Sequence, residues 1–154
     1  MVPSTGINRI STAVLISGTG SNLKSLVKFS KTKIYVKEIM NLINNNLING
    51  CANITGGGLS DNIKRIIPDK LSAHISLDKI KTSKIFNWLK NNGISDKEML
   101  KTFNCGVGFC LIVESKNFKK ISKFFSKEYA PYVIGKILNG KNKVKLNGSI
   151  NWYQ

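Results

Sequence analysis

The sequence predicts an α+β fold, in which helices and strands share one domain without alternating strictly. Three observations carry this prediction. Short apolar runs such as residues 107–113 are typical of buried strands, segments such as residues 36–47 repeat apolar residues at helical spacing, and the two patterns follow each other irregularly. At 154 residues the chain is long enough for one domain with a sizeable core.

The first third of the chain begins with a strand, a glycine loop and a stub of helix. Residues 12–17 form a continuous apolar run typical of a buried parallel strand, residues 18–22 a turn, and residues 23–30 the start of a helical pattern. Such a small unit cannot cover its own apolar face, so either another part of the chain covers it or this end of the chain is loosely ordered. Residues 32–36 resemble a second strand, and residues 36–47 a helix.

The middle of the chain mixes both kinds of element. Residues 51–54 predict a short strand that leads into three glycines, and a helix follows the glycines. Residues 71–77 alternate apolar and polar side chains, which predicts a half-buried strand with His74 on its polar side. Residues 85–89 predict a helix that stops at Gly93.

The last third starts with a clear helix signal. Ser95 and Glu98 have the spacing of a capping box, so a helix is expected to begin there. Residues 107–113 predict a strand. Ser115 is expected to cap a further helix, whose aromatic stripe we interpret as part of the core.

Two more strands and a tail complete the prediction. Residues 132–138 and 143–146 predict strands, and the Asn139-Gly140 turn between them indicates a hairpin. The final SINWYQ is short, and we expect it to fray.

Lysine dominates the charge of the chain. Lys and Arg number 24 against 8 Asp and Glu, which gives a formal net charge of +16. This charge would suit a nucleic-acid partner, but the lysines are scattered and only Arg9 and Arg65 supply guanidinium groups. We therefore expect a solvated basic surface without nucleic-acid binding, and keep a basic non-enzymatic nucleic-acid-binding module as the alternative. No segment approaches the roughly 18 apolar residues that cross a bilayer, so no membrane partner is expected.

The cysteines and the histidine predict no metal chemistry. Cys51, Cys105 and Cys110 accompany a single histidine, so the Cys/His spacings of zinc sites are not available, and we expect no metal site. Cys105 has no histidine near it in the sequence, which favours a buried structural thiol over a nucleophile. An odd cysteine count without secretory features predicts reduced thiols and a cytoplasmic location.

Two glycine-rich segments are the strongest functional signal. Residues 51–62 read CANITGGGLSDN, and residues 102–109 read TFNCGVGF. Consecutive glycines allow a ligand to approach the backbone N–H groups, and a helix start after them favours negative charge. The pattern predicts a site for a phosphate-bearing ligand, with a simple tight turn as the alternative. Asp61 is expected to cap the helix after the glycines.

From about residue 32 to residue 150 the chain resembles the C-terminal domain of phosphoribosylformylglycinamidine cyclo-ligase, also called AIR synthetase. The matching stretches are TKIYVK, ANITGGGLSDNIKRIIPD, IFNWLKNNG, EMLKTFNCGVGF and YVIGKI, in family order. The resemblance implies an AIR-synthetase-like mixed sheet with helices packed on it. It also implies a C–N bond-forming ligase of purine biosynthesis, which uses ATP and magnesium to convert formylglycinamidine ribonucleotide to aminoimidazole ribonucleotide.

The same resemblance implies which residues hold the ribonucleotide. These are the residues of the two glycine-rich segments: Thr55, Gly56, Gly57, Gly58, Asn104, Gly106 and Gly108. Asn53 stands where the family usually has a histidine. The catalytic residue is unknown. If that histidine positions phosphate or moves a proton, Asn53 can do only the first, because an asparagine donates and accepts hydrogen bonds but does not titrate.

The first 31 residues resemble a different purine enzyme. AVLISGTGSNLKSLVKFS is similar to the first strand, loop and helix of phosphoribosylglycinamide formyltransferase, which implies phosphate binding by Gly20, Ser21 and Asn22. We therefore expect a formyltransferase-like fragment at residues 1–31, the AIR-synthetase-like domain at residues 32–150 and a tail at residues 151–154. A formyltransferase fragment is the further alternative function.

The resemblance also implies what the chain lacks. The amino-terminal domain of the cyclo-ligase, which supplies much of its ATP site, has no counterpart in the sequence. We expect the chain alone to bind no ATP or magnesium tightly and to be inactive, and we expect its partner to be that domain in trans or a second copy of the chain. The reversed order of the two resemblances indicates a truncated or rearranged reading frame.

Overall fold

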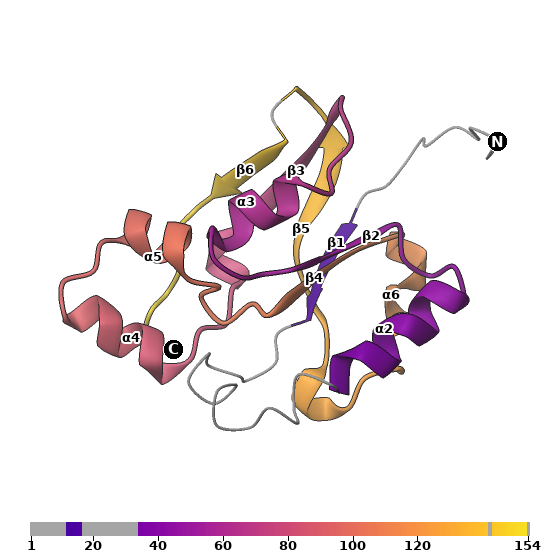
Figure 1. Ribbon diagram of the computed structural model, residues 1–154, viewed down its shortest axis with the longest axis horizontal. Helices are drawn as coiled ribbons and strands as arrows, with labels where there is room; N and C mark the ends of the chain where they lie inside the picture. Colours follow the sequence, from indigo (N-terminus) through magenta and orange to yellow (C-terminus); the bar gives the residue numbers. More distant parts are fainter. Residues whose placement is uncertain (1–11, 17–33, 142, 154) are drawn as a thin grey trace.

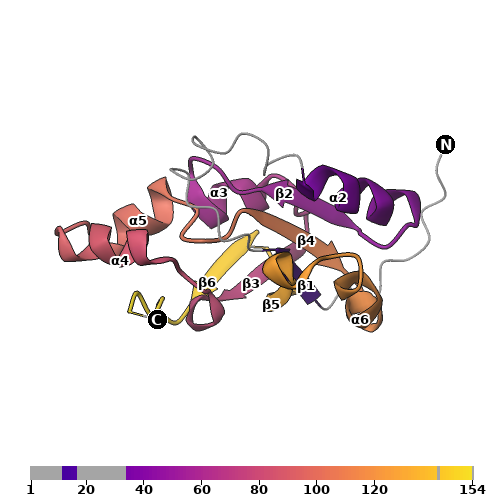
Figure 2. The ribbon, with the colours of Figure 1, turned by 90° about the horizontal axis from the view of Figure 1, so that it is seen from below.

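The described residues form a six-stranded mixed sheet with helices packed on it (Figures 1 and 2). The computed structural model describes residues 12–16, 34–141 and 143–153. The strands follow the order β2-β4-β1-β5-β3-β6, and all neighbours are antiparallel except β3 and β6. The predicted α+β class is confirmed. Within these described ranges, no helix has the length and apolar character needed to cross a membrane.

The elements have the following bounds. The strands are β1 Thr12–Ile16, β2 Gly50–Asn53, β3 Leu71–Ser76, β4 Phe109–Val113, β5 Tyr132–Asn139 and β6 Val144–Asn147. The α-helices are α2 Ile34–Asn44, α3 Gly58–Lys64, α4 Lys84–Asn91, α5 Asp96–Thr102 and α6 Phe118–Ser122. Three short 3₁₀ helices are η1 Leu77–Lys79, η2 Ser115–Asn117 and η3 Lys127–Tyr129.

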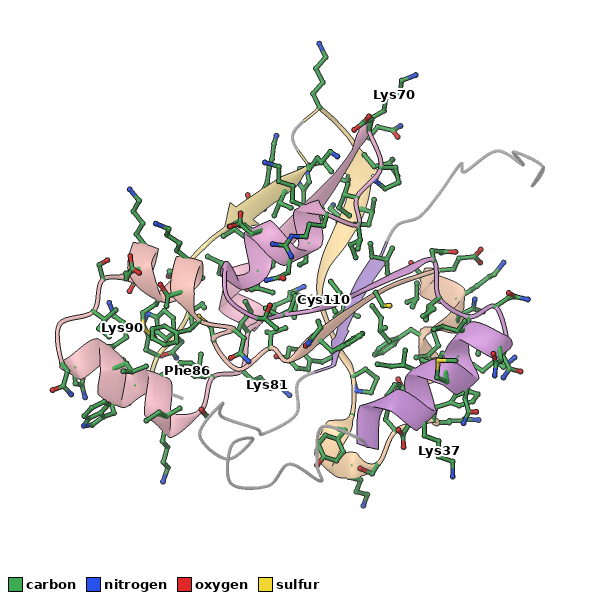
Figure 3. All side chains as sticks on the ribbon, in the orientation of Figure 1. Lys37, Lys70, Lys81, Phe86, Lys90 and Cys110 are labelled. Carbon is green, nitrogen blue, oxygen red and sulfur yellow. The ribbon has the colours of Figure 1, made fainter. Side chains whose placement is uncertain are left out.

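The alternation of β4 divides the core into two clusters on opposite faces of the sheet. Cys110 and Ile112 point into the cluster that includes residues of α3, α4 and α5, whereas Leu111 and Val113 point into the cluster with α2 and α6. Figure 3 shows the side chains that fill the space between the sheet and the helices, Cys110 and Phe86 among them. Phe125, which follows α6, lies in the second cluster, and Phe118 and Phe124 pack against it, which confirms the predicted core role of these aromatic residues.

One end of the sheet carries both glycine-rich segments. Asn53, the last residue of β2, pairs with Phe109, the first residue of β4. In the centre of the sheet, Ile16 of β1 also pairs with Phe109, and Leu15 pairs with Tyr132 at the start of β5. The chain therefore leaves β1 and β2, and enters β4 and β5, at the same end, which we call the loop end.

The structure corrects two expectations for the first part of the chain. The strand at Thr12–Ile16 forms, but it is antiparallel to both of its neighbours, because β4 and β5 run in the opposite direction. It lies in the middle of the sheet, so it is not a structural unit apart from residues 32–150. The formyltransferase-like origin of residues 1–31 stays a prediction. The second strand expected at residues 32–36 is wrong, because α2 begins at Ile34.

The predicted hairpin at Asn139-Gly140 is also wrong. β5 has β1 on one side and β3 on the other, so no edge of β5 is open to β6. β6 pairs instead with the free edge of β3, in parallel, with His74 opposite Lys145. The chain crosses over β3 on the way, where Gly140 N–H donates a hydrogen bond to the carbonyl of Lys70 at 2.9 Å.

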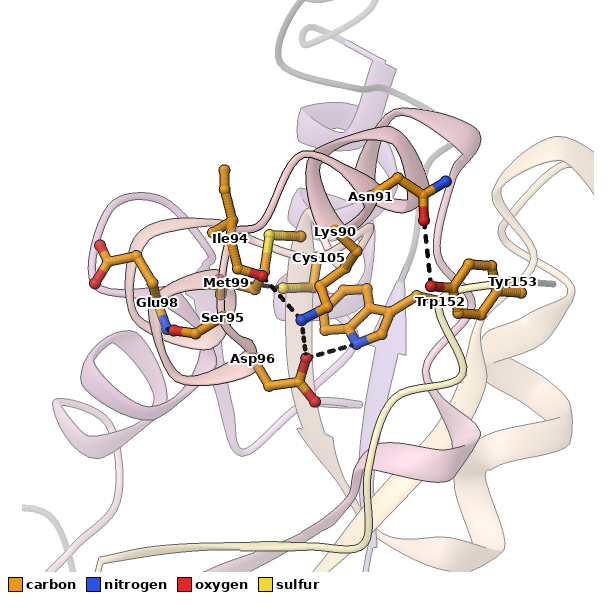
Figure 4. Close-up of polar contacts among 10 residues, drawn as sticks. All are labelled: Lys90, Asn91, Ile94, Ser95, Asp96, Glu98, Met99, Cys105, Trp152 and Tyr153. Carbon is orange, nitrogen blue, oxygen red and sulfur yellow. Dashed lines mark hydrogen bonds and ion pairs between the residues drawn. The ribbon is translucent and has the colours of Figure 1, made fainter.

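The tail is not frayed. Ile150 and Trp152 are each 5% exposed, and both belong to the core cluster of α3, α4 and α5. Trp152 Nε1 donates a hydrogen bond to Asp96 Oδ1 at 3.0 Å, and the same carboxylate forms an ion pair with Lys90 (Figure 4). A buried indole with a satisfied N–H fixes the end of the chain against α4 and α5, which outweighs the usual mobility of a short tail.

Candidate functional site

The first glycine-rich loop is a tight turn that leads into α3. Gly58 N–H donates a hydrogen bond to the carbonyl of Thr55 at 3.1 Å, which closes the turn. Gly57 and Gly58 have φ values of 91° and 61°, a region that glycine adopts readily. Thr55 and Gly56 are exposed, and a Cβ added at Gly56 would meet no atom of residues 12–16, 34–141 or 143–153 within 4 Å. Among the described residues, the loop therefore presents open space beside the backbone of Gly56.

Asn62 holds this loop in place and is a residue that the sequence prediction missed. It is 5% exposed, and its side-chain nitrogen donates to the carbonyls of Gly58, Gly56 and Thr55 at 2.8, 3.2 and 3.4 Å. Its Oδ1 accepts from Thr55 Oγ1 at 3.4 Å. The available signal was a polar residue on the buried side of the helix, one turn after the glycines. Asn62 thereby binds three carbonyl groups of the loop and fixes its shape.

Asp61 does not cap α3 as expected. The N-cap residue is Gly57, and no side chain forms a capping hydrogen bond there. Asp61 is exposed, and its carboxylate lies against Gly57, since an added Cβ on that glycine would be 3.0 Å from Asp61 Oδ2. Within residues 12–16, 34–141 and 143–153, no group of three or more His, Cys, Asp or Glu side chains could hold a metal ion.

The second loop turns sharply at Cys105 and Gly106. These residues have φ values of 51° and 94°, as in a type I′ turn, and Val107 N–H donates to the carbonyl of Asn104 at 2.9 Å. Asn104 is 5% exposed, and its Oδ1 accepts from Gly106 N–H at 3.2 Å, so its side chain shapes the turn. A Cβ on Gly106 would be 2.5 Å from the carbonyl oxygen of Lys81.

The structure brings the two loops side by side. Ile54 N–H donates to the carbonyl of Gly108 at 3.0 Å, which extends the pairing of β2 with β4 to the base of both loops. A Cβ on Gly58 would be 1.9 Å from the carbonyl oxygen of Leu100, so the start of α3 packs directly on α5. Among the described residues, nothing lies within 4 Å of a Cβ added at Gly108, as at Gly56. Each loop thus has one glycine whose Cα faces space that no described atom fills.

Cys105 is structural, as predicted. It is 1% exposed, and its thiol donates to the carbonyl of Met99 at 3.3 Å. Burial, with a smaller contribution from the charge of Asp96, raises the pKa of the Cys105 thiol to about 12. The thiol is therefore protonated near neutral pH and is a poor nucleophile.

The remaining predicted residues are only partly described. Asn53 is exposed at the end of β2, beside both loops. Gly20, Ser21 and Asn22 lie outside the described residues. The chain leaves β1 after Ile16, at the loop end of the sheet.

Comparison with known sequences connects the chain to purine enzymes. The family described as "AIR synthase related protein, C-terminal domain" matches residues 5–147. The chain is 45% identical over 111 residues to a trifunctional purine biosynthetic protein adenosine-3 from Chironomus tentans, covering 71% of this chain and 8% of that protein. It is 41% identical to a phosphoribosylformylglycinamidine cyclo-ligase from Carboxydothermus hydrogenoformans and 36% identical to the chloroplastic one from Arabidopsis thaliana. These matches cover 75% and 79% of this chain but 34% and 32% of those enzymes, so the chain spans about a third of their length.

Solved structures share the fold at low identity. Escherichia coli HypE, a hydrogenase maturation protein, superposes with a TM-score of 0.65 and 14% identity, over 92% of this chain and 47% of that one. Thermotoga maritima PurL complexed with FGAR superposes with a TM-score of 0.60 and 12% identity, over 96% and 27%. At these identities the similarity concerns the fold alone.

Proposed function

We infer a role in purine biosynthesis for this chain, which belongs to the family of AIR synthase related protein C-terminal domains. The proposed role is the substrate-holding part of a phosphoribosylformylglycinamidine cyclo-ligase. Its named relatives carry this ligase activity in chains about three times as long, or carry the domain inside a multifunctional protein. We propose that the 154-residue chain binds the ribonucleotide but closes no ring by itself.

The observation that carries this proposal is the pairing of the two glycine-rich loops. The hydrogen bond between Ile54 and Gly108 brings residues 55–58 and 104–108 together at the loop end. Gly56 and Gly108 are open, and phosphate groups bind well where glycine exposes the backbone N–H groups. We propose that Thr55, Gly56, Gly57, Gly58, Asn104, Gly106 and Gly108 form the ribonucleotide site, with the buried Asn104 and the three left-handed glycines giving the loops their shape.

Asn53 is proposed to orient the substrate. It is exposed beside the loops and can donate and accept hydrogen bonds, for example with the amide group of formylglycinamidine ribonucleotide. It cannot act as a general acid or base, because an amide does not titrate in the working pH range. Any proton transfer during ring closure is therefore assigned to a group outside Asn53.

ATP and magnesium are proposed to act only in the complete enzyme. Bound ATP would activate the formyl oxygen of the substrate by phosphoryl transfer, a reaction that depends mostly on positioning and electrostatics. Thermotoga maritima PurL has been solved with ATP, but at 14% identity this says nothing of residues in this chain. The proposed partner is the amino-terminal domain in trans or a second copy of the chain, and the proposed location is cytoplasmic.

The proposal is tested by titrating the chain with formylglycinamidine ribonucleotide in a calorimeter. Gly56→Ala adds a methyl group to open space in the first loop, so it should leave the melting temperature unchanged and weaken binding at least about tenfold by occupying the ligand's space. Gly50→Ala is the matched control, because its added Cβ would lie 3.5 Å from Ile112 in ordinary contact, at the opposite end of β2. No saturable binding by the unmodified chain would refute the proposed substrate. Equal affinities of both variants would refute the loop as its site.

A further inference from the structure

We propose that Lys81 supplies the positive charge of the site and contacts a phosphoryl group of the bound ligand. Neither the sequence prediction nor the family resemblance assigns Lys81 a role. The inference rests on the proposed function, because it places a phosphorylated ligand at the two loops. It commits to one chemistry, a phosphoryl anion, which the ribonucleotide and ATP both carry.

The backbone of Lys81 bridges the second loop to the start of β5. Its carbonyl oxygen lies against Gly106, where an added Cβ would come within 2.5 Å. Its N–H donates a hydrogen bond to the hydroxyl of Tyr132 at 3.2 Å. Two contacts to separate parts of the loop end fix the Cα of Lys81, and Figure 3 shows this residue on the segment that runs from η1 to α4.

The side chain of Lys81 lies over the ring of Tyr132 near the loop end, and its positive charge is not neutralised by a carboxylate of the described residues. Its Nζ lies 5.0 Å from the centroid of the Tyr132 ring, a cation–π contact that leaves the ammonium group able to donate hydrogen bonds. Lys81 is exposed, and no carboxylate in the described ranges forms an ion pair with it. The charge is therefore oriented but available to an anion.

The two loops need such a charge. Residues 53–58 and 104–108 contain no lysine, arginine or histidine, so they offer backbone N–H groups and hydroxyls but no full positive charge. A phosphate monoester carries between one and two negative charges near neutral pH. A lysine ammonium is a compact charge suited to phosphate, and the residue that contacts Gly106 is positioned to supply it.

The experiment compares two charge-removing variants of the full chain. Lys81→Gln removes the proposed contact, and Lys84→Gln removes an exposed charge three residues later, at the first residue of α4. Each protein is titrated calorimetrically with formylglycinamidine ribonucleotide, ATP and inorganic phosphate. We expect Lys81→Gln to weaken binding of the ribonucleotide about tenfold, and Lys84→Gln to change it by about twofold or less. Both melting temperatures should remain unchanged, because both side chains are exposed.

The outcomes separate this inference from the proposed function. A loss confined to the ribonucleotide identifies its phosphate as the group bound, and a loss confined to ATP identifies a nucleotide phosphate. Equal effects of the two variants, or no effect of Lys81→Gln, would overturn the assignment of Lys81. If the unmodified chain binds inorganic phosphate through Lys81 but not the ribonucleotide, the inference stands and the proposed function fails. If it binds none of the three ligands, both are wrong.

Discussion

Gly58→Ala is the sharpest perturbation of the contact between α3 and α5. The new Cβ would be 1.9 Å from the carbonyl oxygen of Leu100 and 3.2 Å from that of Phe103, and these backbone atoms cannot rotate away as a side chain could. Overpacking of this kind costs about 1–3 kcal/mol. The φ of 61° adds about 1 kcal/mol for a residue with a Cβ. We therefore expect the free energy of unfolding to fall by about 2–4 kcal/mol.

Gly93→Ala separates the two contributions. Gly93 has a φ of 86°, but an added Cβ would meet nothing within 4 Å, so only the backbone cost of about 1 kcal/mol remains. In a chain of this length 1 kcal/mol corresponds to about 2–4 °C in melting temperature. Urea unfolding followed by circular dichroism measures both variants. Equal losses at Gly58 and Gly93 would refute the close contact between α3 and Leu100.

Four further substitutions test individual contacts, each by urea unfolding followed by circular dichroism. Asn62→Asp keeps the shape of the side chain but removes its N–H donors, so the unfolding free energy should fall by about 2 kcal/mol. An unchanged value would contradict the role of Asn62 in holding the first glycine-rich loop. Ser72→Ala should raise the unfolding free energy by about 1 kcal/mol, because Ser72 is 0% exposed and its hydroxyl has no hydrogen-bond partner among the described residues; a loss would show that the hydroxyl is bonded. Trp152→Phe should lower the unfolding free energy by about 1–2 kcal/mol through the lost hydrogen bond to Asp96. An unchanged value would support a frayed tail instead. The folded pKa of Cys105, about 12, exceeds its usual 9.0, so between these pH values the unfolded chain has released a proton that the folded chain keeps. Stability should therefore fall as the pH rises through this window, and Cys105→Ala should reduce that slope; an identical slope would contradict the buried thiol.

Two local signals in the sequence predicted local structure correctly. Ser95 and Glu98 read as a capping box, and Ser95 Oγ indeed accepts from Glu98 N–H at 3.2 Å at the start of α5. The chain turns away from α4 at Gly93, which has a left-handed backbone. Its position after two asparagines indicated this helix stop. These features depend on neighbours within four residues, so the sequence contains all the information that decides them.

Pairing between distant segments was predicted poorly. Asn139-Gly140 is a strong hairpin signal, yet β5 is already flanked on both sides, a fact that depends on the central position of β1. Trp152 lies at the end of the chain, and only the position of Asp96 in space shows that its indole N–H has a partner. For the candidate site, the glycines predicted the loops, but the role of Asn62 depends on which face of α3 is buried.

The claim that this chain holds the substrate while another domain brings ATP is tested most directly by a ring-closure assay. The chain is incubated with formylglycinamidine ribonucleotide, ATP and magnesium, alone and with the amino-terminal domain of a related cyclo-ligase. The account predicts no aminoimidazole ribonucleotide from the chain alone and ATP-dependent product from the mixture. Product from the chain alone, or none from a mixture in which the chain binds the ribonucleotide, would contradict it.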